Sequence, residues 1–138
     1  MLKNEQELFD RLKDYAIPDL VRAPHQNSRY DCASKMNKVA IELKCRRVHY
    51  DELMIEHGKY RALFDNFMVT GFKPVYVCAT PNGVWLFSLS KIREPQWVTK
   101  RLPTKTEFGY PKMKPKMVGF IDVSQGQDIT DILRIKRL

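Results

Sequence analysis

The sequence predicts a single α/β domain, with a sheet of short strands flanked by helices. Residues 4–16 repeat apolar side chains at the three- and four-residue spacing of an amphipathic helix. Residues 38–45 instead alternate apolar with other side chains, as a strand does. Residues 74–79 form a continuous apolar run, typical of a strand covered on both faces. A Pro-Asn-Gly turn then predicts a hairpin with a strand at 84–89.

The first half of the chain carries clear boundary signals. Asn4 is a suitable N-cap for the first helix, and Pro18 ends that helix. Glu5 precedes two apolar residues by three and four positions, so its carboxylate projects from the inward face of the helix. Two short strands are expected before the strand at 38–45, at 19–23 and 29–33.

The second half of the chain is less regular. A second helix is expected over residues 51–69, and Gly71 lies where a C-cap is expected. Residues 90–117 lose periodicity and hold four prolines, which favours an extension without regular structure. One more strand is expected at 118–123, and a helical turn at 129–133. The expected organisation is a core at about 4–90, a basic extension at 91–117 and a C-terminal segment at 118–138.

The chain is basic, and its excess charge is concentrated in one segment. The 138 residues hold 24 Lys and Arg against 16 Asp and Glu, a net charge of +8. Residues 91–116 contribute eight basic and two acidic side chains, which is most of the excess. A polyanionic partner, nucleic acid first, is the natural interpretation, and a surplus that only maintains solubility is the alternative.

Cysteine usage and hydropathy exclude other classes of protein. Three cysteines without a Cys-x-x-Cys pair do not indicate a disulfide framework, and they favour a reduced compartment. No spacing among cysteines and histidines matches a zinc site. No run approaches the roughly 20 apolar residues of a membrane span, and the first 13 residues are too charged for a signal peptide. We therefore expect a cytoplasmic protein without a membrane partner.

Charged residues interrupt one of the predicted strands. Glu42 and Lys44 are two positions apart, so they share one face of the strand. A hairpin turning at 35–36 would set Asp31 opposite Ala40 and diagonal to Glu42. Two adjacent carboxylates repel unless a proton or a cation lies between them, and oxygen ligands of this kind suit Mg²⁺ or Mn²⁺. A solvated sheet face with a Glu–Lys pair is the alternative.

This ordered set of motifs resembles the PD-(D/E)xK nuclease superfamily, which places an acid on one strand and Glu-x-Lys on the next. Asp31 matches the first acid, and Glu42 and Lys44 match the Glu-x-Lys. The sequence is similar in style to archaeal Holliday junction resolvases, whose first helix opens with a Glu-x-Glu-apolar-apolar run. Residues 5–9 reproduce that run, and the resemblance covers about residues 4–90.

The resemblance implies a restriction-endonuclease-like fold, with a mixed central sheet flanked by helices in α-β-β-β-α-β order. It also implies a metal-dependent DNA endonuclease that uses Mg²⁺, with Mn²⁺ as a substitute. Asp31, Glu42 and the Leu43 carbonyl would bind the metal. Lys44 would orient the attacking water and offset the charge that builds on phosphorus, and Glu5 would assist directly or through water.

Basic residues would hold the DNA around such a site. On the second helix, Lys59 could reach the phosphate. The basic extension supplies the remaining candidates: Lys100, Arg101, Lys105, Lys112, Lys114 and Lys116. Aromatic residues between them could stack on unpaired bases: Trp97, Phe108 and Tyr110. The alternative is a solvated loop whose aromatic side chains pack into the core.

Three functions fit these observations. The first is an endonuclease that selects DNA by structure, for example branched or single-stranded DNA. The second is a nucleic-acid-binding protein or accessory subunit on the same fold that does not cut, and the third is a structural or inhibitor protein. The two acids and the lysine favour the first, because a protein that only binds has no need of carboxylates facing phosphates. RNA in place of DNA, and a homodimer that makes paired cuts, stay open.

Overall fold

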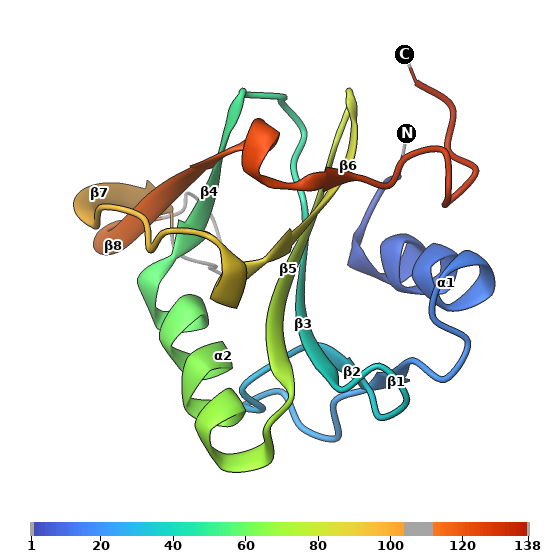
Figure 1. Ribbon diagram of the computed structural model, residues 1–138. Helices are drawn as coiled ribbons and strands as arrows, with labels where there is room; N and C mark the ends of the chain where they lie inside the picture. The colour runs from blue at the N-terminus through green and yellow to red at the C-terminus, as the bar shows by residue number, and fades with distance from the viewer. Residues whose placement is uncertain (1, 104–111, 138) are drawn as a thin grey trace.

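The structure is a computed structural model that describes residues 2–103 and 112–137 (Figure 1). The first half of the chain contains α1 (Glu5–Tyr15), β1 (Val21–Arg22), β2 (Cys32–Ser34), β3 (Val39–Cys45), β4 (Glu52–Glu56) and α2 (His57–Thr70). The second half contains β5 (Lys73–Thr80), β6 (Gly83–Ser88), the 3-10 helix η1 (Leu89–Lys91), β7 (Val98–Pro103), β8 (Met113–Asp122), the 3-10 helix η2 (Val123–Gln125) and β9 (Gln127–Asp128).

A mixed six-stranded sheet lies between the two helices, which cover opposite faces (Figure 1). Its strand order is β1-β2-β3-β5-β6-β9, and β3 and β5 are the parallel pair. Successive residues of β3 point to opposite faces, so Ile41 and Leu43 pack with Leu8 of α1, while Ala40 and Glu42 face α2. The predicted fold class, a mixed sheet flanked by helices, is confirmed.

A second, three-stranded sheet has the order β4-β8-β7 and corrects the predicted second helix. Residues 52–56 form a strand, and the helix begins only at His57. Leu53 and Ile55 are buried and alternate with more exposed residues, which is a period of two. The partner strand β8 lies some 60 residues further along the chain. Local periodicity cannot reveal such a partner, and it is the pairing that selects strand over helix.

The basic extension also forms regular structure, against the expectation for residues 90–117. Strand β7 pairs antiparallel along its whole length with residues 113–118 of β8. Nearly all side chains of β7 and of the first half of β8 are exposed or half-buried. A ribbon open to solvent on both faces needs no alternation of apolar and polar residues, so the sequence carries no signal for it. Residues 104–111 lie outside the described part of the chain.

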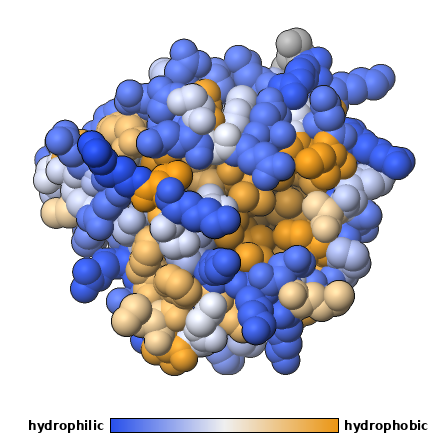
Figure 2. Space-filling view, in the orientation of Figure 1, coloured by the Kyte–Doolittle hydropathy of each residue, from blue (hydrophilic) through white to orange (hydrophobic). Residues whose placement is uncertain are grey.

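Four predicted elements are confirmed to within one residue at each end: the first helix and the strands at 38–45, 74–79 and 84–89. The strands expected at 19–23 and 29–33 are shorter, at 21–22 and 32–34, and the strand expected at 118–123 begins earlier, at residue 113. Helix α1 is capped by Asn4, whose side chain accepts a hydrogen bond from the Glu7 N–H at 2.9 Å. The expected turn near the C-terminus is present, with the Leu133 N–H donating to the Ile129 carbonyl at 3.1 Å. Figure 2 shows hydrophilic side chains over most of one face, with apolar surface gathered between α1 and α2. Within the described residues, neither helix is long and apolar enough to cross a membrane.

Replacing two glycines, one inside α2 and one at its C-cap, by alanine should change the free energy of unfolding in opposite directions. Gly71 has a φ of 76°, the left-handed region that disfavours a Cβ, so Gly71→Ala should destabilise the protein by about 1 kcal/mol. At Gly58, in the first turn of α2, a Cβ would meet nothing within 4 Å. Gly58→Ala should therefore stabilise the protein by about 0.5 kcal/mol. Urea denaturation measures both variants, and a shift of the same sign in both would contradict this account.

Candidate active site

The two predicted acids Asp31 and Glu42 lie beside each other near the end of β2. The observed register pairs Cys32 with Ile41. Ala40 pairs with Ala33, so the predicted register, with Asp31 facing Ala40, is wrong by two residues. Asp31 lies one residue before β2, and its side chain shares a hydrogen bond with Glu42. The inference that the two acids share one face still holds, and the true register brings them closer together.

The β2–β3 turn explains the difference in register. It spans residues 35–38, one residue later along the chain than the predicted connection at 34–37, which turned at 35–36. The Ser34 hydroxyl accepts a hydrogen bond from the Asn37 N–H at 3.1 Å and donates one to Asp19 at 2.6 Å. Lys38 closes the turn with a φ of 53°. Because Asp19 lies in a distant segment, its contribution to the turn could not be read from the local sequence.

Beyond the end of β2, the Asp31 carboxylate accepts a hydrogen bond from the backbone of β3. The Asp31 N–H donates to the Ile41 carbonyl at 2.9 Å, and Asp31 Oδ2 accepts the Leu43 N–H at 2.7 Å. In a strand, the N–H and carbonyl of one residue point to the same side. The Leu43 carbonyl therefore points to the side where Asp31 lies, while the Leu43 side chain is buried in the core beneath α1.

Glu42 is a buried acid with a neighbouring acid. The residue is only 8% exposed, and this burial is the main reason why its pKa rises to about 8. The charge of Asp31 and a hydrogen bond to the Asp31 side chain raise the pKa further. Two lysines partly oppose this rise: Lys59, whose Nζ lies 3.9 Å from Glu42 Oε2, and Lys44. The two carboxylates therefore retain a proton near neutral pH, and a divalent cation would replace it.

A second ion pair flanks Lys44 across the cleft. Glu56, the last residue of β4, lies 2.9 Å from Lys116 Nζ on β8. Burial opposes ionisation of Glu56, but its hydrogen bond and ion pair with Lys116 lower its pKa overall, and Lys44 and Lys59 add to this. The charge of Lys44 thus acts on two carboxylates, those of Glu42 and Glu56, and lowers the pKa of each.

These groups open into one cleft of about 740 Å³ at the edge of the sheet, the catalytic cleft. The cleft is lined by all the predicted catalytic and metal-binding residues: Glu5, Asp31, Glu42, Leu43 and Lys44. Glu5 comes from α1, on the opposite face of the sheet, and is half-buried. Within residues 2–103 and 112–137, no three His, Cys, Asp or Glu side chains are close enough to hold one ion together. Glu5 therefore reaches the cleft without joining the two carboxylates in a compact group.

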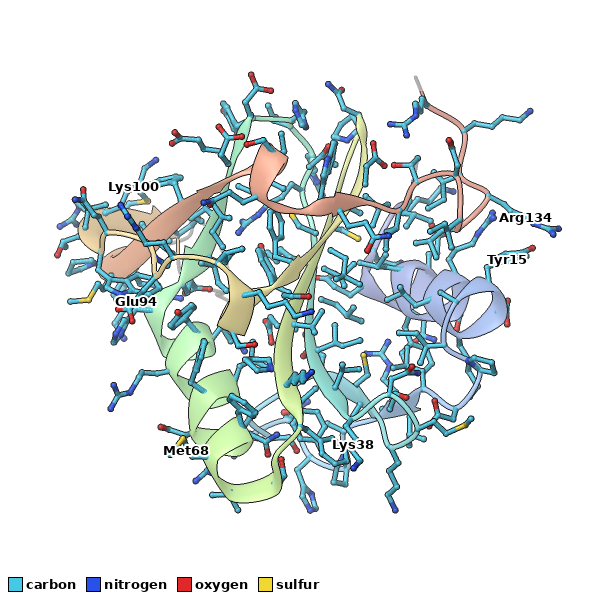
Figure 3. The ribbon with its side chains drawn as sticks, viewed as in Figure 1. Tyr15, Lys38, Met68, Glu94, Lys100 and Arg134 are labelled. Atoms are coloured by element: carbon cyan, nitrogen blue, oxygen red, sulfur yellow. The ribbon has the colours of Figure 1, made fainter. Side chains whose placement is uncertain are left out.

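The structure brings some of the predicted basic residues to the catalytic cleft. Lys59, Lys114 and Lys116 line it. Lys100 lines a neighbouring pocket, and Figure 3 shows it on the side of the molecule away from α1. Two others do not line the cleft: Arg101 donates to the Met113 carbonyl at 3.3 Å, and Lys112 is exposed. Lys105 lies outside the described residues.

The predicted aromatic platform is not formed by Trp97. Its ring centroid lies 4.7 Å from that of His57 and 5.1 Å from that of Tyr60. Trp97 therefore packs against the α2 side of the core, as the alternative interpretation held. Phe108 and Tyr110 lie outside the described residues.

Two arginines of the catalytic cleft were missed by the sequence reading. Arg46 Nη2 donates to the Met54 carbonyl at 2.9 Å, which holds the side chain against β4. A signal was present, because Arg46 is two positions after Lys44 and so continues the same face of the strand. Arg22 packs its guanidinium 4.7 Å from the centroid of the Phe9 ring. Its strand has only two residues, too short for any periodic pattern.

Comparisons with known proteins support the fold. No protein-family model matches the chain, and no curated protein sequence matches it. The structure is similar to that of Archaeoglobus fulgidus Hjc, a Holliday junction resolvase from an archaeal hyperthermophile. The TM-score is 0.56 at 15% sequence identity, and the match covers 97% of this chain and 95% of that chain. The protein therefore shares the fold of that resolvase, the restriction-endonuclease-like fold that its resemblance to archaeal resolvases implied.

Glu42→Gln is expected to stabilise the metal-free protein in a pH-dependent way. The pKa of Glu42 is about 8 in the folded protein, against an ordinary value of 4.5. The folded state therefore binds more protons between these values, and stability is lost as the pH rises through that window. Glu42→Gln should match the wild type near about pH 4.5 and exceed its free energy of unfolding by about 2–4 kcal/mol at about pH 9.

Urea denaturation of metal-free protein across this pH range makes the measurement. Glu52→Gln, which neutralises an exposed carboxylate at the other end of β4, is the matched control and should follow the wild-type curve. A constant offset between Glu42→Gln and the wild type at every pH would show that Glu42 is not a strained buried acid.

Proposed function

We propose that the protein is a metal-dependent endonuclease that hydrolyses phosphodiester bonds in DNA. The observation that carries the proposal is the pair of facing carboxylates, Asp31 and Glu42, with Lys44 on the same face of β3. They open into a cleft lined by further lysines, on a fold shared with a Holliday junction resolvase. A protein that only binds DNA gains nothing from placing two acids where phosphates would lie.

The oxygen atoms at the end of β2 fit a small divalent cation. Asp31 and Glu42 supply carboxylates, and the Leu43 carbonyl points to the same side. Mg²⁺ is commonly bound by one or two carboxylates, with waters and phosphate oxygens completing its shell, and Mn²⁺ takes similar ligands. When bound, such an ion lowers the pKa of a coordinated water and polarises the phosphodiester. The raised pKa of Glu42 supports the assignment, since a cation relieves the repulsion that causes part of it.

Lysines around the acids provide the remaining groups that hydrolysis needs. Lys44 lies on the same strand face as Glu42, where its ammonium can orient a water and offset negative charge on phosphorus in the transition state. In the structure, Lys59 Nζ forms an ion pair with Glu42 Oε2 at 3.9 Å. With Glu42 engaged by a cation, the Lys59 ammonium would be available to hold a phosphate oxygen of the substrate.

The β7–β8 ribbon would track the DNA backbone away from the acids. Lys114 and Lys116 are two positions apart on β8, so they share one face of the strand, and both line the catalytic cleft. Lys100 lies opposite Lys116 on β7. Cross-strand partners share a face, so the three ammonium groups form a short row that leads out of the cleft. Such a row suits the regular spacing of backbone phosphates and carries no preference for base sequence.

The proposal predicts metal-dependent cleavage that depends on Lys44. Plasmid, single-stranded and four-way-junction DNA incubated with Mg²⁺ or Mn²⁺ should be cut, and EDTA should abolish cutting. Lys44→Ala should lower the cleavage rate by about 100-fold or more while DNA affinity changes little, because the lysine acts in the transition state. Asp31→Ala and Glu42→Ala should remove cleavage. Gel assays of rate and anisotropy measurements of binding in EDTA separate the two effects.

Lys35→Ala is the matched control, because this lysine is exposed in the β2–β3 turn at the other end of β2. It should cut and bind like the wild type. Cleavage of every substrate by Lys44→Ala at the wild-type rate would refute the catalytic assignment. Salt-sensitive binding without cleavage under any metal condition would favour a non-cutting accessory protein.

Metal affinity should rise with pH. Glu42 must lose its proton to bind a cation, and its pKa of about 8 lies above neutrality. The Mn²⁺ association constant should therefore increase by up to about tenfold per pH unit below that value. Isothermal titration at two pH values, each in two buffers of different ionisation enthalpy, measures both affinity and proton release. An affinity that does not change with pH, or one retained by Glu42→Gln, would place the cation elsewhere.

A further inference from the structure

A second pocket adjoins the catalytic cleft on the side of β4 and β7. It has a volume of about 560 Å³ and is lined by Arg46, Arg47, Tyr50, Lys100 and Phe120, among others. We refer to it as the Tyr50 pocket. Its volume falls within the roughly 300–1,000 Å³ range of sites for small molecules and cofactors.

The Tyr50 pocket combines flat apolar surface with positive charge. Tyr50 is 66% exposed, and within the described residues its side chain makes no hydrogen bond, ion pair or ring contact. Lys100 Nζ lies 5.3 Å from the centroid of the Phe120 ring, so this lysine occupies one side of the pocket. Exposed Arg47 lines it too. An unpartnered phenol ring beside guanidinium and ammonium groups is suited to a planar ring attached to a phosphate.

The pocket and the catalytic cleft share part of their walls. Arg46, Met54 and Leu102 line both. Arg46 is held in place by its bond to the Met54 carbonyl, so the boundary between the two spaces is fixed. Arg46 also lies two residues beyond Lys44, about 7 Å along an extended chain. A strand whose phosphate lies at Lys44 would therefore bring an adjacent nucleotide to the mouth of the Tyr50 pocket.

We propose that the Tyr50 pocket receives an unstacked nucleobase of the strand that is cut in the catalytic cleft. The base stacks on the Tyr50 ring, and Arg47 and Lys100 hold the phosphates on either side of it. A fully paired duplex cannot supply such a base without unstacking it, so the preferred substrate has an unpaired nucleotide beside the scissile phosphate. This inference rests on the proposed function and names its substrate class.

A double comparison of protein and DNA variants tests the proposal. The wild type, Tyr50→Ala, Tyr50→Phe and Tyr15→Ala are compared for binding in EDTA, so that cleavage does not enter. Tyr15 is an exposed tyrosine on α1, at the far side of the molecule from Lys100, and serves as the matched control (Figure 3). The DNA is a duplex with a three-nucleotide single-stranded gap, either intact or with an abasic site at each gap position in turn, beside a fully paired duplex.

Tyr50→Ala should bind the intact gapped DNA about tenfold more weakly than the wild type, the size of effect that one base–aromatic stack gives. One abasic position should weaken wild-type binding to a similar extent and leave Tyr50→Ala unaffected. Tyr50→Phe should restore the wild-type pattern, and Tyr15→Ala should show it too. Affinity for the fully paired duplex should be the same for all four proteins.

The inference is overturned if Tyr50→Ala binds the gapped DNA like the wild type. It is equally overturned if Tyr50→Ala loses the same affinity on intact and abasic DNA, since the tyrosine then does not contact a base. Parallel incubation of the gapped DNA with Mg²⁺ judges the proposed function separately. Base-dependent binding without cleavage would refute the proposed nuclease activity and leave the base-binding role of the Tyr50 pocket standing. Cleavage that does not depend on Tyr50 would leave the nuclease activity standing and refute the role of the pocket.

Discussion

The bond from the Leu43 N–H to the Asp31 carboxylate determines where the candidate active site can exist. Strand β2 has only three residues, so β3 would expose an unpaired backbone beyond Ile41. Asp31 satisfies that backbone with its side chain, and the sheet edge is stabilised without a further strand residue. The space that the missing strand would fill becomes the catalytic cleft. The carboxylate that closes the edge is thereby brought beside Glu42.

Electrostatics explains why the rim of the cleft is basic while its floor is acidic. A buried Glu42 beside Asp31 is unfavourable, which raises its pKa to about 8. Lys59 at 3.9 Å and Lys44 offset part of that cost in the absence of a cation. If a cation neutralised the acids, the same lysines would attract a polyanion. The two lysines beside Glu42 thus stabilise the unliganded fold and would then serve binding.

The sequence predicted those parts of the fold that depend on local pattern. Helix α1, strand β3 and the β5–β6 hairpin follow from spacing, and Glu42 and Lys44 share a face because a strand has a period of two. Strand β4 and the β7–β8 ribbon were missed, because their partners are distant or both faces are exposed. The register of Asp31 was missed because Asp19, in another segment, bonds to Ser34 and Met36 and so helps to place the turn one residue later than predicted. Arg46 could have been recognised from its position after Lys44, whereas Tyr50 carries no pattern at all.

The central claim is that Asp31, Glu42 and the Leu43 carbonyl form one divalent-cation site. The most direct measurement is crystallographic: crystals soaked in Mn²⁺ are measured at a wavelength where manganese scatters anomalously. The account predicts an anomalous peak within about 2.3 Å of one oxygen from each of these three residues, with the Lys59 ammonium moved away from Glu42. A peak elsewhere, or a Lys59–Glu42 ion pair that persists in saturating Mn²⁺, would contradict it.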